Sequence, residues 1–176
     1  MSRANESRVL QHPGSTREAA MIESKISISD NNRRKLVELL NARLADTIDM
    51  QTQMKFAHWN VKGENFYQLH LLFDTIAERM EDAVDLIAER ITALGGRANG
   101  TARQVASASS LKEYDIVAGM DHVRTLLDRL AAVANASRGA ISESDELEDR
   151  ATSDLFTEVV RTANKDLYFL ESHLHG

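Results

Sequence analysis

Two pairs of side chains that could bind a metal ion lie close together in this sequence. His70 and Asp74 form one pair, and Asp85 and Glu89 form the other. Residues four positions apart lie on the same face of a helix, so each pair can converge on one cation. Imidazole and carboxylate ligands suit a divalent first-row metal such as iron, zinc or manganese. A further histidine, His58, precedes the first pair and is separated from it by a Gly-Glu-Asn turn.

The two pairs cannot bind the same cation within one helix. Asp74 and Asp85 are eleven residues apart, which is about 16 Å along a helix axis. If this helix packs antiparallel against the same helix of a second copy, with a two-fold axis near Arg79 or Met80, the first pair of one chain meets the second pair of the other. Such isologous contacts create two equivalent sites. With His58 across the turn, the set predicts a site of two imidazoles and three carboxylates shared by two chains.

A structural interpretation of the same residues stays open at this point. Acidic side chains on one flank of a helix usually form a solvated face, and Glu78 and Glu81 lie on this flank as well. Histidines near a turn more often cap helix ends or satisfy polar groups in a core. The candidate ligands lie beside the apolar stripe of their helix rather than on it, so they are expected outside the core.

The elements that carry these residues are predicted to be four long helices. Proline occurs once and glycine eight times in 176 residues, so little interrupts a helix. Apolar spacing and turn residues predict helices at about 30–59, 65–94, 119–141 and 149–173. The connection between the second and third helices is long and is predicted to carry a short helical piece at 111–117. This all-α arrangement, a four-helix bundle with one long crossover, is the ferritin-like topology.

Composition limits the remaining possibilities. Residues 1–28 are polar and predict a flexible arm ahead of a bundle at 29–176. The absence of cysteine excludes disulfides, thiolate ligands and cysteine nucleophiles. No apolar run is long enough to span a membrane and the N-terminus has no signal-peptide core, so we expect a cytoplasmic protein. The net charge of −6 argues against a basic body that binds nucleic acid.

The sequence around the candidate ligands resembles the signature of the Dps family, the DNA-protection-during-starvation miniferritins. The resemblance is carried by His58-Trp59-Asn60-Val61-Lys62-Gly63, Asn65-Phe66, His70, Asp74, Asp85 and Ala88-Glu89-Arg90, followed by Leu94-Gly95-Gly96. It covers nearly all of residues 30–174. Ordinary ferritins build a di-iron site inside one bundle with Glu-x-x-His motifs, and this chain contains no Glu-x-x-His.

The resemblance implies a function and an assembly. Members of the family are hollow dodecamers built from two-fold dimers, which oxidise Fe(II), preferentially with hydrogen peroxide, and store ferric mineral as part of a stress response that protects DNA. By position, the ferroxidase centre binds two iron ions with His58, His70 and Asp74 of one subunit and Asp85 and Glu89 of its two-fold mate. Trp59 would lie beside this centre, either as an electron donor or as a packing aromatic.

Iron needs an entry path, and acidic residues near the last helix are candidates for it. An acidic connection at 142–149 precedes Asp154 and Glu158. These two residues are four positions apart and match the region that lines three-fold pores in the family, although solvated surface is the alternative interpretation. The remaining histidines are predicted to be surface residues without a metal role: His12, His122, His173 and His175.

DNA binding is the second hypothesis for function. The arm contains Arg3, Arg8 and Arg17 but no lysine in its first twenty residues, and the crossover adds Arg97 and Arg103. Because phosphate contacts scale with the available positive charge, we expect DNA binding that is weak or salt-sensitive at most. The alternative to a ferroxidase is therefore a nucleoid-associated protein that compacts DNA and whose metal site is mainly structural.

Overall fold

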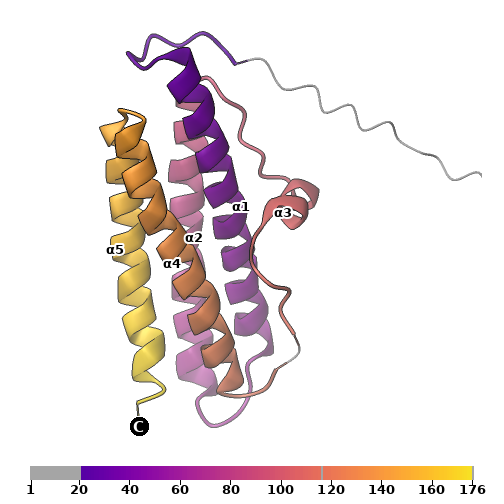
Figure 1. Cartoon of the computed structure of the whole chain (residues 1–176). Helices are drawn as coiled ribbons and strands as arrows, with labels where there is room; N and C mark the ends of the chain where they lie inside the picture. Colours follow the sequence, from indigo (N-terminus) through magenta and orange to yellow (C-terminus); the bar gives the residue numbers. More distant parts are fainter. Residues whose placement is uncertain (1–20, 116, 176) are drawn as a thin grey trace, which may run out of the picture.

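The computed structural model describes residues 21–115 and 117–175, which form a bundle of helices (Figure 1). In chain order these are α1 (Asp30–Asn60), α2 (Phe66–Ala93), α3 (Ala102–Ala108), α4 (Asp121–Glu146) and α5 (Arg150–Ser172). The predicted all-α fold, with four long helices and a short one in the crossover, is confirmed. Most of the predicted arm, including Arg3, Arg8, His12 and Arg17, lies outside the described residues.

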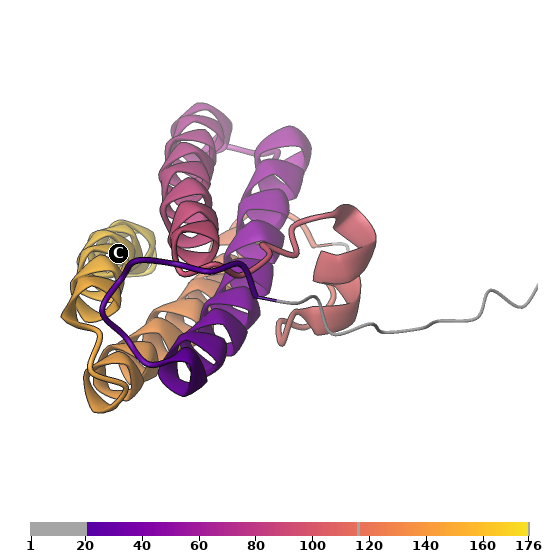
Figure 2. The same cartoon turned by 90° about the horizontal axis from the view of Figure 1, so that it is seen from above.

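The four long helices pack as two hairpins. α1 packs against α2 and α4 against α5, while α1 also contacts α4 and α2 contacts α5. The bundle therefore closes in the order α1, α2, α5, α4, and α3 lies outside it against α1 (Figure 2). Within the described ranges, none of the helices is long and apolar enough to cross a membrane.

Local sequence signals set the ends of the first hairpin. Ser29 caps α1 by accepting a hydrogen bond from the backbone N–H of Asn32 at 3.2 Å. In the turn after α1, Gly63 has a φ of 110°, which glycine adopts without strain. The apolar stripe of α2, centred on the fully buried Phe73, faces the core of the bundle. The flank with the candidate ligands is thereby placed outside the core, as the sequence predicts.

The short helix of the crossover begins earlier than predicted. The predicted helical piece at 111–117 is wrong, because the described residues of that segment are not helical. A capping box starts α3, in which the side chain of Gln104 accepts a hydrogen bond from the backbone N–H of Thr101 at 3.1 Å. After α3, the backbone N–H of Ser110 donates to the carboxylate of Asp46 at 2.8 Å. That hydrogen bond holds the segment after α3 against α1. The backbone N–H of Ser110 is therefore not available for a helical hydrogen bond.

The third long helix continues further than the sequence predicts. α4 ends at Glu146 rather than at Ile141, so much of the predicted acidic connection at 142–149 is helical. The acidic side chains of this extra turn are exposed, where a helix tolerates them, and Ser144 on the buried side donates to the carbonyl oxygen of Ala140 at 2.7 Å. The true connection to α5 is therefore short and ends at its cap residue.

The prediction that His122 lies on the surface is wrong. Its side chain is buried, because Tyr114 of the crossover packs against it and hydrogen-bonds to its Nδ1 at 2.8 Å. His173 and His175, near the end of the chain, are exposed as predicted.

Candidate metal centre

His58 and His70 face each other across the turn between α1 and α2. Their rings are stacked, with centroids 3.7 Å apart and planes inclined by 20°. Nδ1 of His58 lies 2.7 Å from the carbonyl oxygen of His70, and Nδ1 of His70 lies 2.9 Å from the carbonyl oxygen of His58. Because a carbonyl oxygen only accepts hydrogen bonds, each Nδ1 carries a proton, and the neutral form of each ring has its lone pair on Nε2. Both histidines are thus held in the tautomer whose Nε2 can bind a metal ion.

Asp74 lies one helical turn beyond His70 and is paired with a lysine. Its Oδ1 lies 3.9 Å from Nδ1 of His58 and accepts a hydrogen bond from Nζ of Lys55 at 2.5 Å. This hydrogen bond from Lys55 holds the pKa of Asp74 below its usual value. In the single chain, the ammonium group of Lys55 therefore balances a carboxylate that is predicted to bind a cation.

The contact between Lys55 and Asp74 predicts competition between the ammonium group and a bound metal ion. In a Lys55→Met variant we expect Zn(II) to bind about fivefold more tightly, the factor for about 1 kcal/mol at a partly exposed ion pair. Isothermal titration calorimetry measures the dissociation constant. Lys62→Met is the matched control, because Lys62 lies over the ring of Phe66 instead. Equal affinities in Lys55→Met and the unmodified protein would contradict the competition.

Asp85 and Glu89 are exposed and lie apart from the histidines. At 1.5 Å per residue, Asp85 is about 16 Å from Asp74 along α2. Among the described residues, neither carboxylate has an ion-pair partner, and no group of three His, Cys, Asp or Glu side chains is close enough to hold a metal ion. One chain thus brings both histidines close to Asp74 and leaves the other two carboxylates separate. A site shared by two chains stays a prediction.

Comparison with known proteins decides the family. A family model for a ferritin-like domain matches residues 37–176. A DNA protection during starvation protein of Agrobacterium fabrum is 40% identical over 154 residues, which cover 86% of this chain and 95% of that protein. This chain belongs to the Dps family. The predicted resemblance and the ferritin-like fold are both confirmed.

Solved Dps structures share the whole architecture. DpsC from Streptomyces coelicolor is 30% identical and superposes with a TM-score of 0.83, covering 95% of this chain and 96% of that chain. A Dps from Microbacterium arborescens, solved in a high-iron form, is 27% identical with a TM-score of 0.78, covering 84% of this chain and 97% of that one. The family thus includes a member that was solved in a high-iron form on the same fold.

Trp59, which follows the first histidine of the Dps signature, is 63% exposed. It lines a cleft of about 810 Å³ between α1 and the crossover, together with Phe56 and Tyr114. In the single chain the indole ring is thus not buried in the core. Trp59 directly follows His58 in the sequence. Its role as an electron donor stays a prediction.

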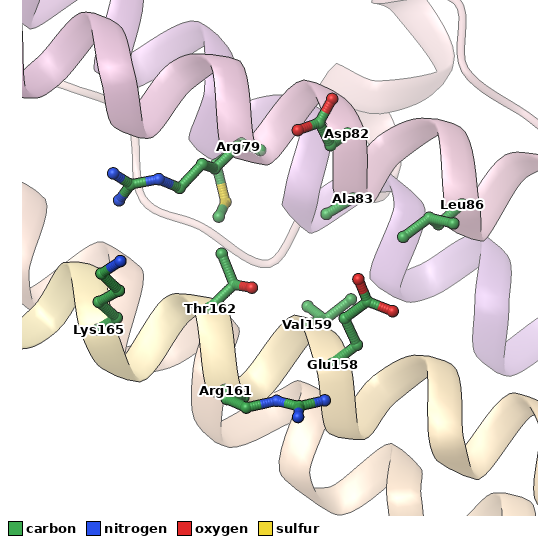
Figure 3. A pocket seen from close by; sticks show the side chains of 10 residues that line it. Arg79, Asp82, Ala83, Leu86, Glu158, Val159, Arg161, Thr162 and Lys165 are labelled. Atoms are coloured by element: carbon green, nitrogen blue, oxygen red, sulfur yellow. The ribbon is translucent and has the colours of Figure 1, made fainter.

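The two predicted pore residues of this Dps chain line different hollows. Glu158 lines a groove of about 620 Å³ between α2 and α5, whose walls also carry Asp82 and Arg161 (Figure 3). Asp154, one turn earlier on α5, lines a separate and more open pocket with Asp145. The two carboxylates therefore do not face one common hollow in the single chain, and their role in a pore between subunits stays a prediction.

Asp166 is fully buried and forms an ion pair with Arg79, a residue of the same groove. Burial raises the pKa of its carboxyl group to about 6. Its Oδ2 has no hydrogen-bond partner in the described part of the chain, which agrees with a carboxylate that is poorly compensated for its loss of water.

We expect Asp166 to make the protein less stable as the pH rises from about 4 to about 6. A carboxyl group with a raised pKa binds its proton more tightly in the folded state, so its stabilising effect is present below the unfolded value of about 3.9 and is lost as the pH rises through about 6. Two pKa units correspond to roughly 3 kcal/mol. Thermal unfolding at several pH values should show this slope in the unmodified protein and not in Asp166→Asn, which cannot titrate. The same slope in both proteins would assign it to other groups.

Arg90 has a structural role that the sequence pattern does not reveal. Its Nη2 donates to both carboxylate oxygens of Asp149 at 2.8 and 2.7 Å, and its Nε donates to the hydroxyl of Thr152 at 2.9 Å. Asp149 also caps α5 by accepting from the backbone N–H groups of Ala151 and Thr152. Burial alone would raise the pKa of Asp149, but the hydrogen bonds from Arg90 and Thr152 outweigh it and lower that pKa. This network fixes the end of α2, next to Glu89, to the start of α5.

Proposed function

We propose that this Dps-family chain oxidises Fe(II), preferentially with hydrogen peroxide, at ferroxidase centres shared between subunits. The ferric product is stored as mineral inside a hollow dodecamer in the cytoplasm, and DNA is thereby protected from oxidative damage. The observation that carries the proposal is the reciprocal hydrogen bonding of His58 and His70, which involves Nδ1 of each ring and not Nε2, with Asp74 one helical turn beyond His70. The high-iron form of the Microbacterium arborescens Dps supports iron as the metal.

In this proposal two copies complete each centre. α2 of one chain lies antiparallel to α2 of the other, with the two-fold axis at the level of Arg79 and Met80. Asp85 and Glu89 are exposed, so a second chain can present its histidines to them. The two-fold axis makes two equivalent centres in each dimer, and each centre binds two iron ions as substrate.

The reaction balances with two ferrous ions and one molecule of hydrogen peroxide. Each ferrous ion gives up one electron, the O–O bond breaks, and two protons complete two molecules of water. Because both electrons are delivered together, no hydroxyl radical is released. The carboxylates of Asp74, Asp85 and Glu89 offset the positive charge of the ferric products, and the imidazoles bind in their neutral form.

Stopped-flow oxidation of anaerobic Fe(II) by hydrogen peroxide tests the proposal. His70→Ala combined with Asp74→Ala should slow the fast phase by about a hundredfold or more, since loss of a mere outer-shell partner of a ligand already weakens metal binding about 10–100-fold. Glu78→Ala combined with Glu81→Ala is the matched control, because it removes two exposed carboxylates of α2 that are not predicted ligands. A fast phase that survives in the first variant would refute the ferroxidase centre.

A further inference from the structure

Tyr114 and His122 form a hydrogen-bonded pair beneath the crossover. The phenol oxygen of Tyr114 lies 2.8 Å from Nδ1 of His122, and the two ring centroids are 5.9 Å apart. Burial lowers the pKa of His122 and raises the pKa of Tyr114, so the imidazole is neutral and the phenol keeps its proton. No other hydrogen bond of this hydroxyl is found in the described part of the chain, so the imidazole tautomer with its lone pair on Nδ1 is the one that gives the phenol proton an acceptor.

An aromatic series connects this pair with the candidate metal centre. The ring of Phe56 on α1 contacts the ring of Tyr114, with centroids 5.0 Å apart. Trp59 lies one helical turn beyond Phe56 and lines the same cleft as Phe56 and Tyr114. It also directly follows His58 in the sequence. Trp59 therefore lies beside the first predicted ligand in the sequence and lines the same cleft as the phenol.

A phenol that is hydrogen-bonded to a neutral imidazole is suited to losing an electron. An oxidised phenol becomes strongly acidic and must release its proton at the same time. A base at hydrogen-bond distance accepts that proton without help from bulk water, and this matters for a side chain that is mostly screened from solvent. A tyrosine that only stabilised the crossover would need the hydrogen bond but not a proton acceptor.

We propose that Tyr114 donates single electrons towards the iron site through Trp59, and that His122 accepts the phenol proton. This inference rests on the proposed ferroxidase function, because the oxidant comes from iron and peroxide. Electron donation from Tyr114 would operate when a centre holds only one ferrous ion as peroxide arrives. The reaction of two ferrous ions with one peroxide does not cover that case.

The electrons and protons of this step balance. A single ferrous ion gives one electron to hydrogen peroxide, which splits into hydroxide and a hydroxyl radical. The radical takes one electron from Trp59 and becomes a second hydroxide, and the oxidised Trp59 takes one electron from Tyr114. The O–H bond of Tyr114 breaks as its proton moves to Nδ1 of His122. The products are a neutral phenoxyl radical and an imidazolium ion inside the protein, instead of a free radical in solution.

The decisive experiment uses no iron, so its outcome is independent of the ferroxidase activity. Pulse radiolysis with the azidyl radical oxidises the single tryptophan of the metal-free assembled protein. We expect the indolyl radical absorbance to decay while a phenoxyl absorbance rises at the same rate. In Tyr114→Phe the phenoxyl signal should be lost and the indolyl radical should persist. Tyr67→Phe and Tyr168→Phe, which remove the other two tyrosines of the chain, should leave the transfer unchanged.

A second variant separates proton acceptance from structural support. His122→Asn places an amide oxygen near the hydroxyl, so it can accept the hydrogen bond but not the proton. We expect the transfer to slow by about a hundredfold or more, within the range for a general base, while the melting temperature stays close to that of the unmodified protein. Transfer to a phenoxyl radical that persists in Tyr114→Phe, or that keeps its rate in His122→Asn, would overturn the inference.

A measurement with iron then tests whether Tyr114 and His122 take part in the reaction of Fe(II) with peroxide. Freeze-quench electron paramagnetic resonance, with one Fe(II) per centre and excess peroxide, should show a tyrosyl radical that disappears in Tyr114→Phe. If the ferroxidase proposal fails, fast Fe(II) oxidation is absent while transfer from Trp59 in the radiolysis experiment persists. If this inference fails, Fe(II) oxidation is intact and the tyrosyl signal survives in Tyr114→Phe.

Discussion

Two inactive variants of this chain should regain about a quarter of the ferroxidase activity when they are refolded together. The first, His70→Ala with Asp74→Ala, lacks one half of every centre, and the second, Asp85→Ala with Glu89→Ala, lacks the other half. A shared centre is intact when its histidine half comes from the second variant and its carboxylate half from the first. Random pairing of chains gives this combination in about one centre out of four.

Stopped-flow oxidation of Fe(II) measures the recovery, and the same variants mixed after separate refolding give the baseline. A centre contained within one chain would show no recovery, because every chain carries a defect. The quantitative control is co-refolding of Asp85→Ala with Glu89→Ala together with the Glu78→Ala and Glu81→Ala chain, which keeps all predicted ligands. Here about half of the centres should be intact. The ratio of the activities recovered in the two co-refolding experiments therefore tests whether chains pair at random.

Replacement of Asp149 by alanine should lower the free energy of unfolding by about 3 kcal/mol or more. The change leaves the guanidinium group of Arg90 largely buried without a counter-charge, which costs about 3–5 kcal/mol in comparable ion pairs. It also removes the side-chain cap of α5, worth about 1 kcal/mol. Differential scanning calorimetry at neutral pH measures the loss as a lower melting temperature.

The pH dependence and two further variants identify the cause of that loss. The pKa of Asp149 is lowered in the folded protein, so its stabilisation is present above about pH 4, the usual unfolded value, and is lost as the pH falls through the folded value. The melting temperatures of the unmodified protein and of Asp149→Ala should therefore converge in acid. Asp149→Asn keeps the cap without the charge and should lose less stability. Asp121→Ala breaks an exposed ion pair with Arg124 and should change little.

The helices that carry the candidate ligands could be predicted closely because their signals are local. The predicted ranges 30–59 and 65–94 differ by one residue at most from the observed ends of α1 and α2. A capping serine, a glycine turn and an apolar stripe with helical spacing all lie within or beside these segments. The exposure of Asp85 and Glu89 follows from their helical spacing relative to this apolar stripe.

The crossover could not be predicted because its structure depends on partners that are distant in the sequence. Ser110 is bound by Asp46, which lies 64 residues earlier. The burial of His122 has a nearer partner, because Tyr114 lies only eight positions earlier, but helical spacing does not show that the irregular end of the crossover folds back over it. Arg90 and Asp149 are again distant in the sequence, 59 positions apart. The spacing of His58 and His70 predicts that they lie on either side of a turn. It does not predict that each ring forms a hydrogen bond with the backbone of the other residue.

The reciprocal hydrogen bonds of His58 and His70 couple the packing of α1 against α2 to the orientation of the two imidazole rings. Each ring is tied to the main chain of the opposite helix, so neither can change rotamer without breaking a contact between α1 and α2. The two rings therefore form one rigid unit, and their conformational freedom is already lost before any predicted metal ion binds. A substitution that strains the turn, such as Gly63→Val at its positive φ, should then weaken metal binding through preorganisation alone, without touching a single ligand.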